Sequence, residues 1–198
     1  MLKMTLKKIK SYAKINLALN ITGKSFSLHK IESIVAFISL CDDIFIKKIR
    51  SKNHNISFSG EFSKKIGKKN TIFKLLDLLD KKDLLGNQKF QIKIKKRIPI
   101  KSGLGGGSMN AANIFKYFIK SKIVKIKKKE IIKICELVGS DVILGLNSSN
   151  LILTSQKRIR PFKDCEKFYT LVVKPNFGCK TKDIYAKLRD FNKPQFNR

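Results

Sequence analysis

The chain has 198 residues and a formal net charge of +30, because 44 Lys and Arg residues are set against only 14 Asp and Glu. That length predicts one domain, or one domain and part of a second, and 42% hydrophobic residues are enough for a core. No apolar run approaches the roughly 18–20 residues of a membrane-spanning helix, and the Lys-rich start lacks the apolar stretch of a secretory signal. The composition therefore argues against a helical membrane protein and wholesale disorder, and it predicts a cytoplasmic protein.

The positive charge points first to a nucleic-acid partner. However, Arg supplies only 6 of the 44 basic residues, and Lys is spread along the whole chain. Recognition of bases and phosphates favours the planar guanidinium of Arg. We therefore expect a site for a polyphosphate ligand, and an RNA-associated protein is the non-enzyme alternative.

The four cysteines, Cys41, Cys135, Cys165 and Cys179, form no C-x-x-C pair and no spacing typical of a metal site. Disulfides are rare in a reducing cytoplasm. These residues are therefore expected to be buried or idle thiols.

The hydrophobic pattern predicts strands and helices without a regular alternation, which favours an α+β fold over a doubly wound sheet. In the first half we expect two extended segments within 6–22 that meet at Ser11-Tyr12, a β-rich stretch over 31–49 with a turn at Cys41-Asp42-Asp43, a strand over 56–59 and a helix over 70–80. In the second half we expect a half-exposed strand over 90–98, helices over 110–119 and 127–138, strands from Leu151 and over 168–174, and a helix over 181–188.

Glycines cluster between the strand over 90–98 and the helix over 110–119, in the segment PIKSGLGGGSMNAA that begins at Pro99. Four of them (Gly103, Gly105, Gly106 and Gly107) stand within five positions, so backbone N–H groups can approach an anion closely. Ser108 stands where a helix N-cap is preferred. No Gly-Lys-Ser/Thr follows, and Ser108 breaks the G-x-G-x-x-G pattern. The segment therefore predicts a phosphate-binding loop that is neither a Walker A loop nor a dinucleotide fingerprint.

Three further positions are candidates for chemistry, although each alone has an ordinary structural explanation. Period-two alternation places Lys14 and Asn16 on one face of a strand, where a lysine is usually solvated. His29 is one of two histidines, and a single histidine is most often a surface residue. Asp141 precedes an apolar run, so it is either the N-cap of a short helix or a carboxylate directed at a ligand.

Five sequence blocks, taken in order, resemble the GHMP small-molecule kinases. They are AKINL from Ala13, SLHKIES from Ser27, the glycine segment from Pro99, LVGSDV from Leu137 and VVKPNFGCKTKDIY from Val172. The first two favour the branch of the family that phosphorylates a cytidine-diphosphate-linked methylerythritol, in the non-mevalonate route to isoprenoid precursors. The resemblance implies ATP and Mg²⁺ as cofactors, a small-molecule substrate and no membrane partner. It implies that Mg²⁺ bridges phosphates with few protein ligands, and no residue is assigned as a metal ligand.

The resemblance also implies a fold and a set of roles. The fold has two α+β lobes: an N-terminal lobe of the ribosomal protein S5 domain 2-like type over 1–150, and part of a ferredoxin-like C-terminal lobe over 151–198. Asp141 is the expected general base, and Lys14 faces the transferred phosphoryl group. The expected ATP-binding residues are Asn70, Pro99, Gly103, Leu104, Gly105, Gly106, Gly107, Ser108 and Asn110. The expected substrate-binding residues are Asn16, His29, Thr181 and Tyr185.

The chain departs from the family pattern at several places. Leu28 replaces a tyrosine, Met109 replaces a hydroxyl residue of the loop, and Ile143 replaces a proline. A later Gly/Ser-rich segment of the family is missing, so we expect a C-terminally truncated kinase that exposes a sheet edge and is poorly soluble. An inactive remnant and a GHMP kinase with another acceptor are the remaining alternatives.

Overall fold

The computed structural model describes residues 6–25, 28–64, 66–67, 69–162, 166–175, 188 and 190–197. Strands and helices mix within these ranges, as the α+β prediction requires. In chain order they are β1 (Lys7–Ser25), β2 (Leu28–Ile49), β3 (Asn55–Ser59), α1 (Thr71–Lys81), β4 (Lys89–Lys95), α2 (Gly106–Lys120), α3 (Lys128–Val138), α4 (Val142–Gly145), β5 (Leu151–Leu153) and β6 (Ile159–Pro161). Among the described residues, no helix is both long and apolar enough to cross a membrane.

The chain divides into two compact units. Unit 1 comprises Met1–Ala13, Ser39–Ile100 and Gly105–Leu146, and unit 2 comprises Lys14–Ile38, Lys101–Leu104 and Asn147–Arg198. The long strands β1 and β2 each contribute residues to both units, and so does the glycine segment between β4 and α2. The two-lobe division at residue 150 stays a prediction.

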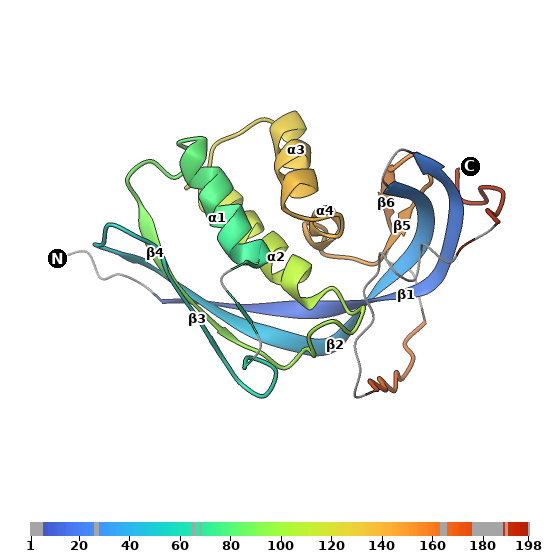
Figure 1. The fold of residues 1–198 in the computed structure, drawn as a ribbon, viewed down its shortest axis with the longest axis horizontal. Helices are drawn as coiled ribbons and strands as arrows, with labels where there is room; N and C mark the ends of the chain where they lie inside the picture. The colour runs from blue at the N-terminus through green and yellow to red at the C-terminus, as the bar shows by residue number, and fades with distance from the viewer. Residues whose placement is uncertain are drawn as a thin grey trace. The chain divides into compact units, whose positions relative to one another are not determined.

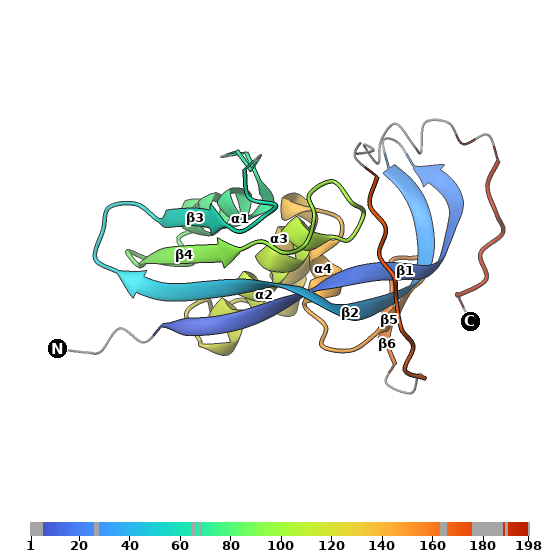
Figure 2. The ribbon, with the colours of Figure 1, turned by 90° about the horizontal axis from the view of Figure 1, so that it is seen from below.

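In unit 1, helices α1, α2 and α3 lie on one face of a sheet (Figure 1). Strand β3 runs parallel to β4, β4 runs antiparallel to β2, and β1 pairs with β2; Figure 2 shows these strands from below. The register places Ile44 opposite Ile94 and Ile46 opposite Ile92, and all four side chains are buried. They form one core with the buried faces of the helices. The alternating strand predicted over 90–98 is therefore confirmed as β4.

Polar residues lie inside the long strands of unit 1, where turns or breaks are predicted. Strand β2 runs unbroken through Cys41-Asp42-Asp43, so the turn predicted there is wrong. The strand accommodates Asp42 because the carboxylate accepts hydrogen bonds from the backbone of Arg97 and Ile98. Strand β1 is likewise continuous through the predicted junction at Ser11.

Unit 2 pairs the first half of β2 antiparallel with β5, and β5 antiparallel with β6. The strand predicted from Leu151 is thereby confirmed. Residues 190–197 belong to this unit and bond to β2: the fully buried carboxylate of Glu32 accepts hydrogen bonds from the N–H groups of Gln195 (2.8 Å) and Phe196 (3.0 Å). Hydrogen bonds to the ionised form outweigh the effect of burial and hold the pKa of Glu32 below its ordinary value.

The strand predicted over 168–174 is wrong, because these residues have no strand hydrogen bonding. Their apolar side chains are exposed, for example 89% for Leu171 and 79% for Val173. A strand needs a neighbour to bond its backbone groups and a surface to bury one face, and no strand in the described part of the chain pairs with this segment. The helix predicted over 181–188 lies outside the described residues except for Leu188.

Candidate active site

The glycine loop leads into α2 through two residues in left-handed conformations. Gly103 and Gly105 have φ angles of 76° and 68°, which glycine adopts at no steric cost. Gly105 is the N-cap of α2, so the prediction that Ser108 caps this helix is wrong. The first hydrogen bond within the helix runs from the Met109 N–H to the Gly105 carbonyl (2.8 Å). No side chain caps the N–H groups of the preceding turn, which is the arrangement that binds anions at helix N-termini.

The N-terminus of α1 is closed by its own cap. The side-chain oxygen of Asn70 accepts hydrogen bonds from the N–H groups of Ile72 (3.0 Å) and Phe73 (3.3 Å), and its Nδ2 donates to the Gly67 carbonyl (2.7 Å). The helix predicted over 70–80 is confirmed, with Asn70 immediately before it. The side-chain oxygen and nitrogen of Asn70 both make hydrogen bonds within the protein. Contact between Asn70 and ATP therefore stays a prediction.

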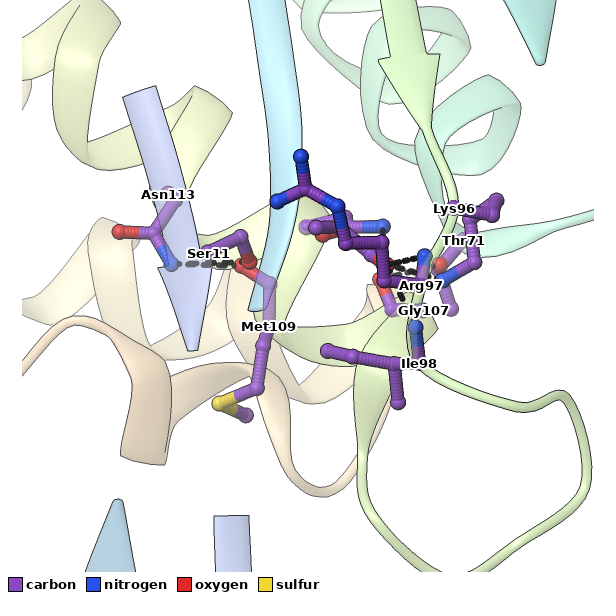
Figure 3. A network of polar contacts seen from close by, with 10 residues as sticks. Ser11, Thr71, Lys96, Arg97, Ile98, Gly107, Met109 and Asn113 are labelled. Atoms are coloured by element: carbon purple, nitrogen blue, oxygen red, sulfur yellow. Dashed lines mark hydrogen bonds and ion pairs between the residues drawn. The ribbon is translucent and has the colours of Figure 1, made fainter. Parts of the chain in front are cut away.

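The starts of α1 and α2 are joined directly. Thr71 Oγ1 donates a hydrogen bond to the Gly107 carbonyl (2.8 Å), as Figure 3 shows. At the end of α3, a Cβ added to Gly139 would lie 3.7 Å from the Ser108 hydroxyl and 3.9 Å from the Thr71 methyl. The two helix starts and the turn from α3 into α4 therefore meet around Ser108.

Asp141 lies in this turn, at the N-cap position of α4, and its side chain makes no capping hydrogen bond. The short helix that follows packs very closely on α2, since a Cβ on Gly145 would lie only 2.6 Å from Ala112 Cβ and 3.0 Å from Met109 Sδ. Met109, at the position where the family has a hydroxyl residue, is fully buried in this contact. Both alternatives for Asp141 thus agree with its position, but its carboxylate is not used as a cap.

Lys14 belongs to unit 2 and is buried, with 6% of its surface exposed, so it is not an ordinary solvated strand lysine. Its Nζ lies 3.4 Å from Asn16 Oδ1, which confirms that the two side chains share a face. The backbone N–H of Lys14 donates to the Leu104 carbonyl in the glycine segment (3.0 Å). This bond places the lysine next to the first part of that segment within unit 2.

The predicted substrate-binding residues are only partly described. His29 lies in β2, and its ring centroid is 6.4 Å from that of Phe191. Asn16 Oδ1 also accepts a hydrogen bond from Ser33 Oγ (3.2 Å). Thr181 and Tyr185 lie outside the described residues, so their roles stay predictions.

Two charged residues near the loop, Asp42 and Lys96, are absent from the predicted site. Both are buried and form an ion pair, and Asn110, predicted to bind ATP, donates to Asp42 Oδ2 (2.8 Å) with 1% of its surface exposed. The period-two alternation of side chains could have identified both residues as buried. Asp42 is two positions from the buried Ile44, and Lys96 is two positions from the buried Ile94, so each falls on the core-facing side. Pro99, also predicted to bind ATP, lies in the loop that connects Lys96 to the start of α2.

Neither described cysteine has a reactive environment. Cys41 and Cys135 are free and buried, and burial raises the pKa of the Cys135 thiol to about 12. Cys165 and Cys179 lie outside the described residues. Within the described ranges, no group of three or more His, Cys, Asp and Glu side chains is arranged to hold a metal ion.

Known proteins share this combination of sequence and fold. The profile of the GHMP kinases N terminal domain matches residues 70–153. The 4-diphosphocytidyl-2-C-methyl-D-erythritol kinase of Pelagibacter ubique (strain HTCC1062) is 58% identical over 190 residues, which cover 96% of this chain and 68% of that protein. The chain belongs to the 4-diphosphocytidyl-2-C-methyl-D-erythritol kinase family. The kinase of the same name from Clostridium botulinum (strain Loch Maree / Type A3) is 33% identical over 183 residues, which cover 91% of this chain and 64% of that protein.

Solved structures agree on the fold of this kinase family. A crystal structure of 4-(cytidine 5'-diphospho)-2C-methyl-D-erythritol kinase matches 79% of this chain and 55% of its own, with a TM-score of 0.63 and 24% identity. Homoserine kinase from Cytophaga hutchinsonii ATCC 33406 matches 93% of this chain and 60% of its own, with a TM-score of 0.60 and 16% identity. The predicted GHMP kinase fold is confirmed, and the chain spans about two thirds of the length of its curated kinase relatives.

Proposed function

We propose that this chain transfers the γ-phosphoryl group of ATP to the 2-hydroxyl of 4-diphosphocytidyl-2-C-methyl-D-erythritol. Membership of the kinase family supports both the reaction and the acceptor. The structural observation that carries the proposal is the N-terminus of α2, which follows a glycine loop and has no side-chain cap. Backbone N–H groups at such a helix start bind phosphate oxygens, and the helix dipole favours their negative charge.

In this proposal, the segment from Gly103 to Ser108 binds the triphosphate of ATP through its backbone. Mg²⁺ commonly binds to phosphate oxygens with only one or two protein carboxylates. The cation would therefore arrive with the nucleotide and neutralise part of its charge.

The transfer step uses Asp141 and Lys14. Asp141 accepts the proton of the acceptor hydroxyl as that oxygen forms its bond to the γ-phosphorus, and the bond from the γ-phosphorus to the bridging oxygen of ADP breaks. This role agrees with the place of Asp141 at the N-cap position of α4, where its side chain makes no capping hydrogen bond to the helix. Lys14, held at the loop by its backbone hydrogen bond to Leu104, would stabilise the negative charge of the phosphoryl group.

The acceptor side of the proposal assigns recognition of the cytidyl group to His29, Asn16, Thr181 and Tyr185. Recognition of a nucleotide base requires hydrogen bonds to its edge and stacking on its face, which a histidine and a tyrosine supply together.

The proposal also includes a boundary between two lobes at residue 150 and a cytoplasmic location for the protein.

A coupled assay of ADP release tests the proposed function. The chain is supplied with MgATP and either the cytidyl substrate or mevalonate, and ATP binding is measured separately by equilibrium titration. We expect turnover when MgATP is supplied with the cytidyl substrate, and no turnover when it is supplied with mevalonate. Turnover with mevalonate alone would contradict the proposed acceptor, and absence of ATP binding would contradict the assignment of the glycine loop.

A further inference from the structure

One buried carboxylate, that of Asp42, bonds to protein segments on both sides of the glycine loop. Its Oδ1 accepts hydrogen bonds from the N–H groups of Arg97 (2.7 Å) and Ile98 (2.9 Å). Its Oδ2 forms an ion pair with Lys96 Nζ and accepts a hydrogen bond from Asn110 Nδ2 (2.8 Å). Figure 3 shows the labelled members Lys96, Arg97 and Ile98 around this network. Asp42 itself is 0% exposed.

The partners of Asp42 lie at the two ends of the loop in the sequence. Lys96, Arg97 and Ile98 leave β4 just before the loop, whereas Asn110 stands in α2 just after it. All of these residues belong to unit 1. A single side chain on β2 therefore bonds both to the backbone that enters the loop and to the helix that follows it.

The first turn of α2 also packs directly on the residues that Asp42 holds. A Cβ added to Gly106 would lie 2.9 Å from Ile98 Cγ2 and 3.3 Å from Lys96 Nζ. A shift of the 96–98 segment would thus move the backbone N–H groups at the start of the helix. Those N–H groups bind a ligand well only when they are held in advance in the bound geometry.

We propose that Asp42 is a positioning residue that sets the geometry of the glycine loop for its polyphosphate ligand. The proposal rests on the function proposed above, in which the loop binds ATP. Asp42 touches no ligand in this role and acts through Arg97, Ile98 and Asn110. Its loss should therefore weaken binding of ATP more than the rate of phosphoryl transfer or the binding of the acceptor.

The chain offers a matched control in the adjacent residue. Asp43 is also a buried carboxylate on β2, but it pairs with Arg97 Nη2 (3.0 Å) and Lys8 Nζ (3.8 Å). It makes none of the bonds to the loop backbone or to α2 that Asp42 makes. Asp43→Ala therefore removes a buried carboxylate from the same strand without removing the hydrogen bonds that define the proposal.

The test compares Asp42→Ala with Asp43→Ala. Alanine offers no acceptor to the N–H groups of Arg97 and Ile98 or to Asn110 Nδ2, so the first variant removes all the hydrogen bonds of Asp42. Because Asp42→Ala also leaves the Lys96 ammonium buried without its carboxylate, a second variant combines it with Lys96→Met. The double variant thereby separates the cost of an unpaired buried charge from loss of positioning.

The first measurement is amide hydrogen exchange at Arg97 and Ile98. We expect exchange to be at least about tenfold faster in both Asp42 variants and unchanged in Asp43→Ala. The second measurement is an equilibrium titration with MgATP, in which the dissociation constant should rise by about tenfold, and KM for ATP should rise more than kcat falls. Wild-type exchange and wild-type ATP affinity in the double variant would overturn the proposal. If the unchanged chain binds no ATP, the proposed function fails, and the exchange rates still decide whether Asp42 holds the loop.

Discussion

Thr71 and Gly107 join a capped helix start to an uncapped one through a hydrogen bond of 2.8 Å from Thr71 Oγ1 to the Gly107 carbonyl. Asn70 caps α1 by accepting hydrogen bonds from the N–H groups of Ile72 and Phe73. The hydrogen bond from Thr71 ends on the carbonyl oxygen of Gly107. It therefore fixes the start of α2 without occupying the N–H donors of that helix. Each helix N-terminus carries roughly half a positive charge. The pair therefore presents a positive site in which the first turn of α2 has no side-chain cap.

Asp141→Asn should remove the proposed general base without a change of shape. We expect kcat to fall by about 10²- to 10⁴-fold, the usual contribution of a positioned base, while the dissociation constant for ATP stays within about twofold. Single-turnover kinetics and nucleotide titration measure the two effects. Ser140→Ala is the control, since its hydroxyl lies 3.4 Å from Asp141 Oδ1 and is exposed. Normal turnover in the asparagine variant would disprove the assignment.

Gly145→Ala should destabilise unit 1 and move the turn that carries Asp141. The added methyl would lie 2.6 Å from Ala112 Cβ, and overpacking of this kind costs about 1–3 kcal/mol. Urea unfolding measures the loss. Gly67→Ala is the control, because none of the described residues other than its chain neighbours lies within 4 Å of the added methyl. Ala112→Gly in the Gly145→Ala background should restore part of the stability, and failure to do so would refute steric overlap as the cause.

The stability of the fold should fall as the pH falls through the titration range of His54. Burial lowers the pKa of this histidine below 6.5, against the opposing effect of Asp80, whose Oδ2 lies 3.2 Å from Nε2, and with a smaller contribution from the charge of Lys89. The unfolded chain therefore binds the proton more readily, so stability is fully present above about pH 7 and is lost as the pH falls toward the lower folded pKa.

Denaturant unfolding at a series of pH values measures this dependence. In His54→Gln, a side-chain oxygen can replace Nδ1, which accepts a hydrogen bond from the Phe90 N–H (3.0 Å). The variant should lose the part of the slope that begins as the pH falls below about 7, while the slope from carboxylates at lower pH persists. An unchanged slope in this variant would show that another group causes the pH dependence.

Glu32→Gln should loosen the attachment of residues 190–197 within unit 2. The carboxylate accepts hydrogen bonds from Gln195, Phe196 and Asn20, and an amide in its place keeps one acceptor oxygen and adds donors. We expect amide exchange at Gln195 and Phe196 to be at least about tenfold faster. Glu61→Gln, an exposed carboxylate in unit 1, should leave both rates unchanged. Equal rates in the two variants would argue against Glu32 as the anchor.

Local patterns in the sequence determined the elements whose shape depends on nearby residues. Period-two alternation identified β4, helical spacing identified α1 and α2, and the glycine run marked the turn between β4 and α2. The face shared by Lys14 and Asn16 follows from the same periodicity. These features survive folding because side-chain direction repeats along a regular backbone whatever the tertiary contacts are.

Only the tertiary structure decided the fate of polar residues inside strands and at the helix start. The local sequence around Asp42 predicts a turn. The donors to its carboxylate lie 54 to 68 positions away, on the side chains of Lys96 and Asn110 and the backbone N–H groups of Arg97 and Ile98. No local pattern reports such partners, and a buried carboxylate is stable only when they are all present. Gly105 rather than Ser108 is the N-cap of α2. The apolar run over 168–174 has no neighbouring strand among the described residues, so it is not a strand.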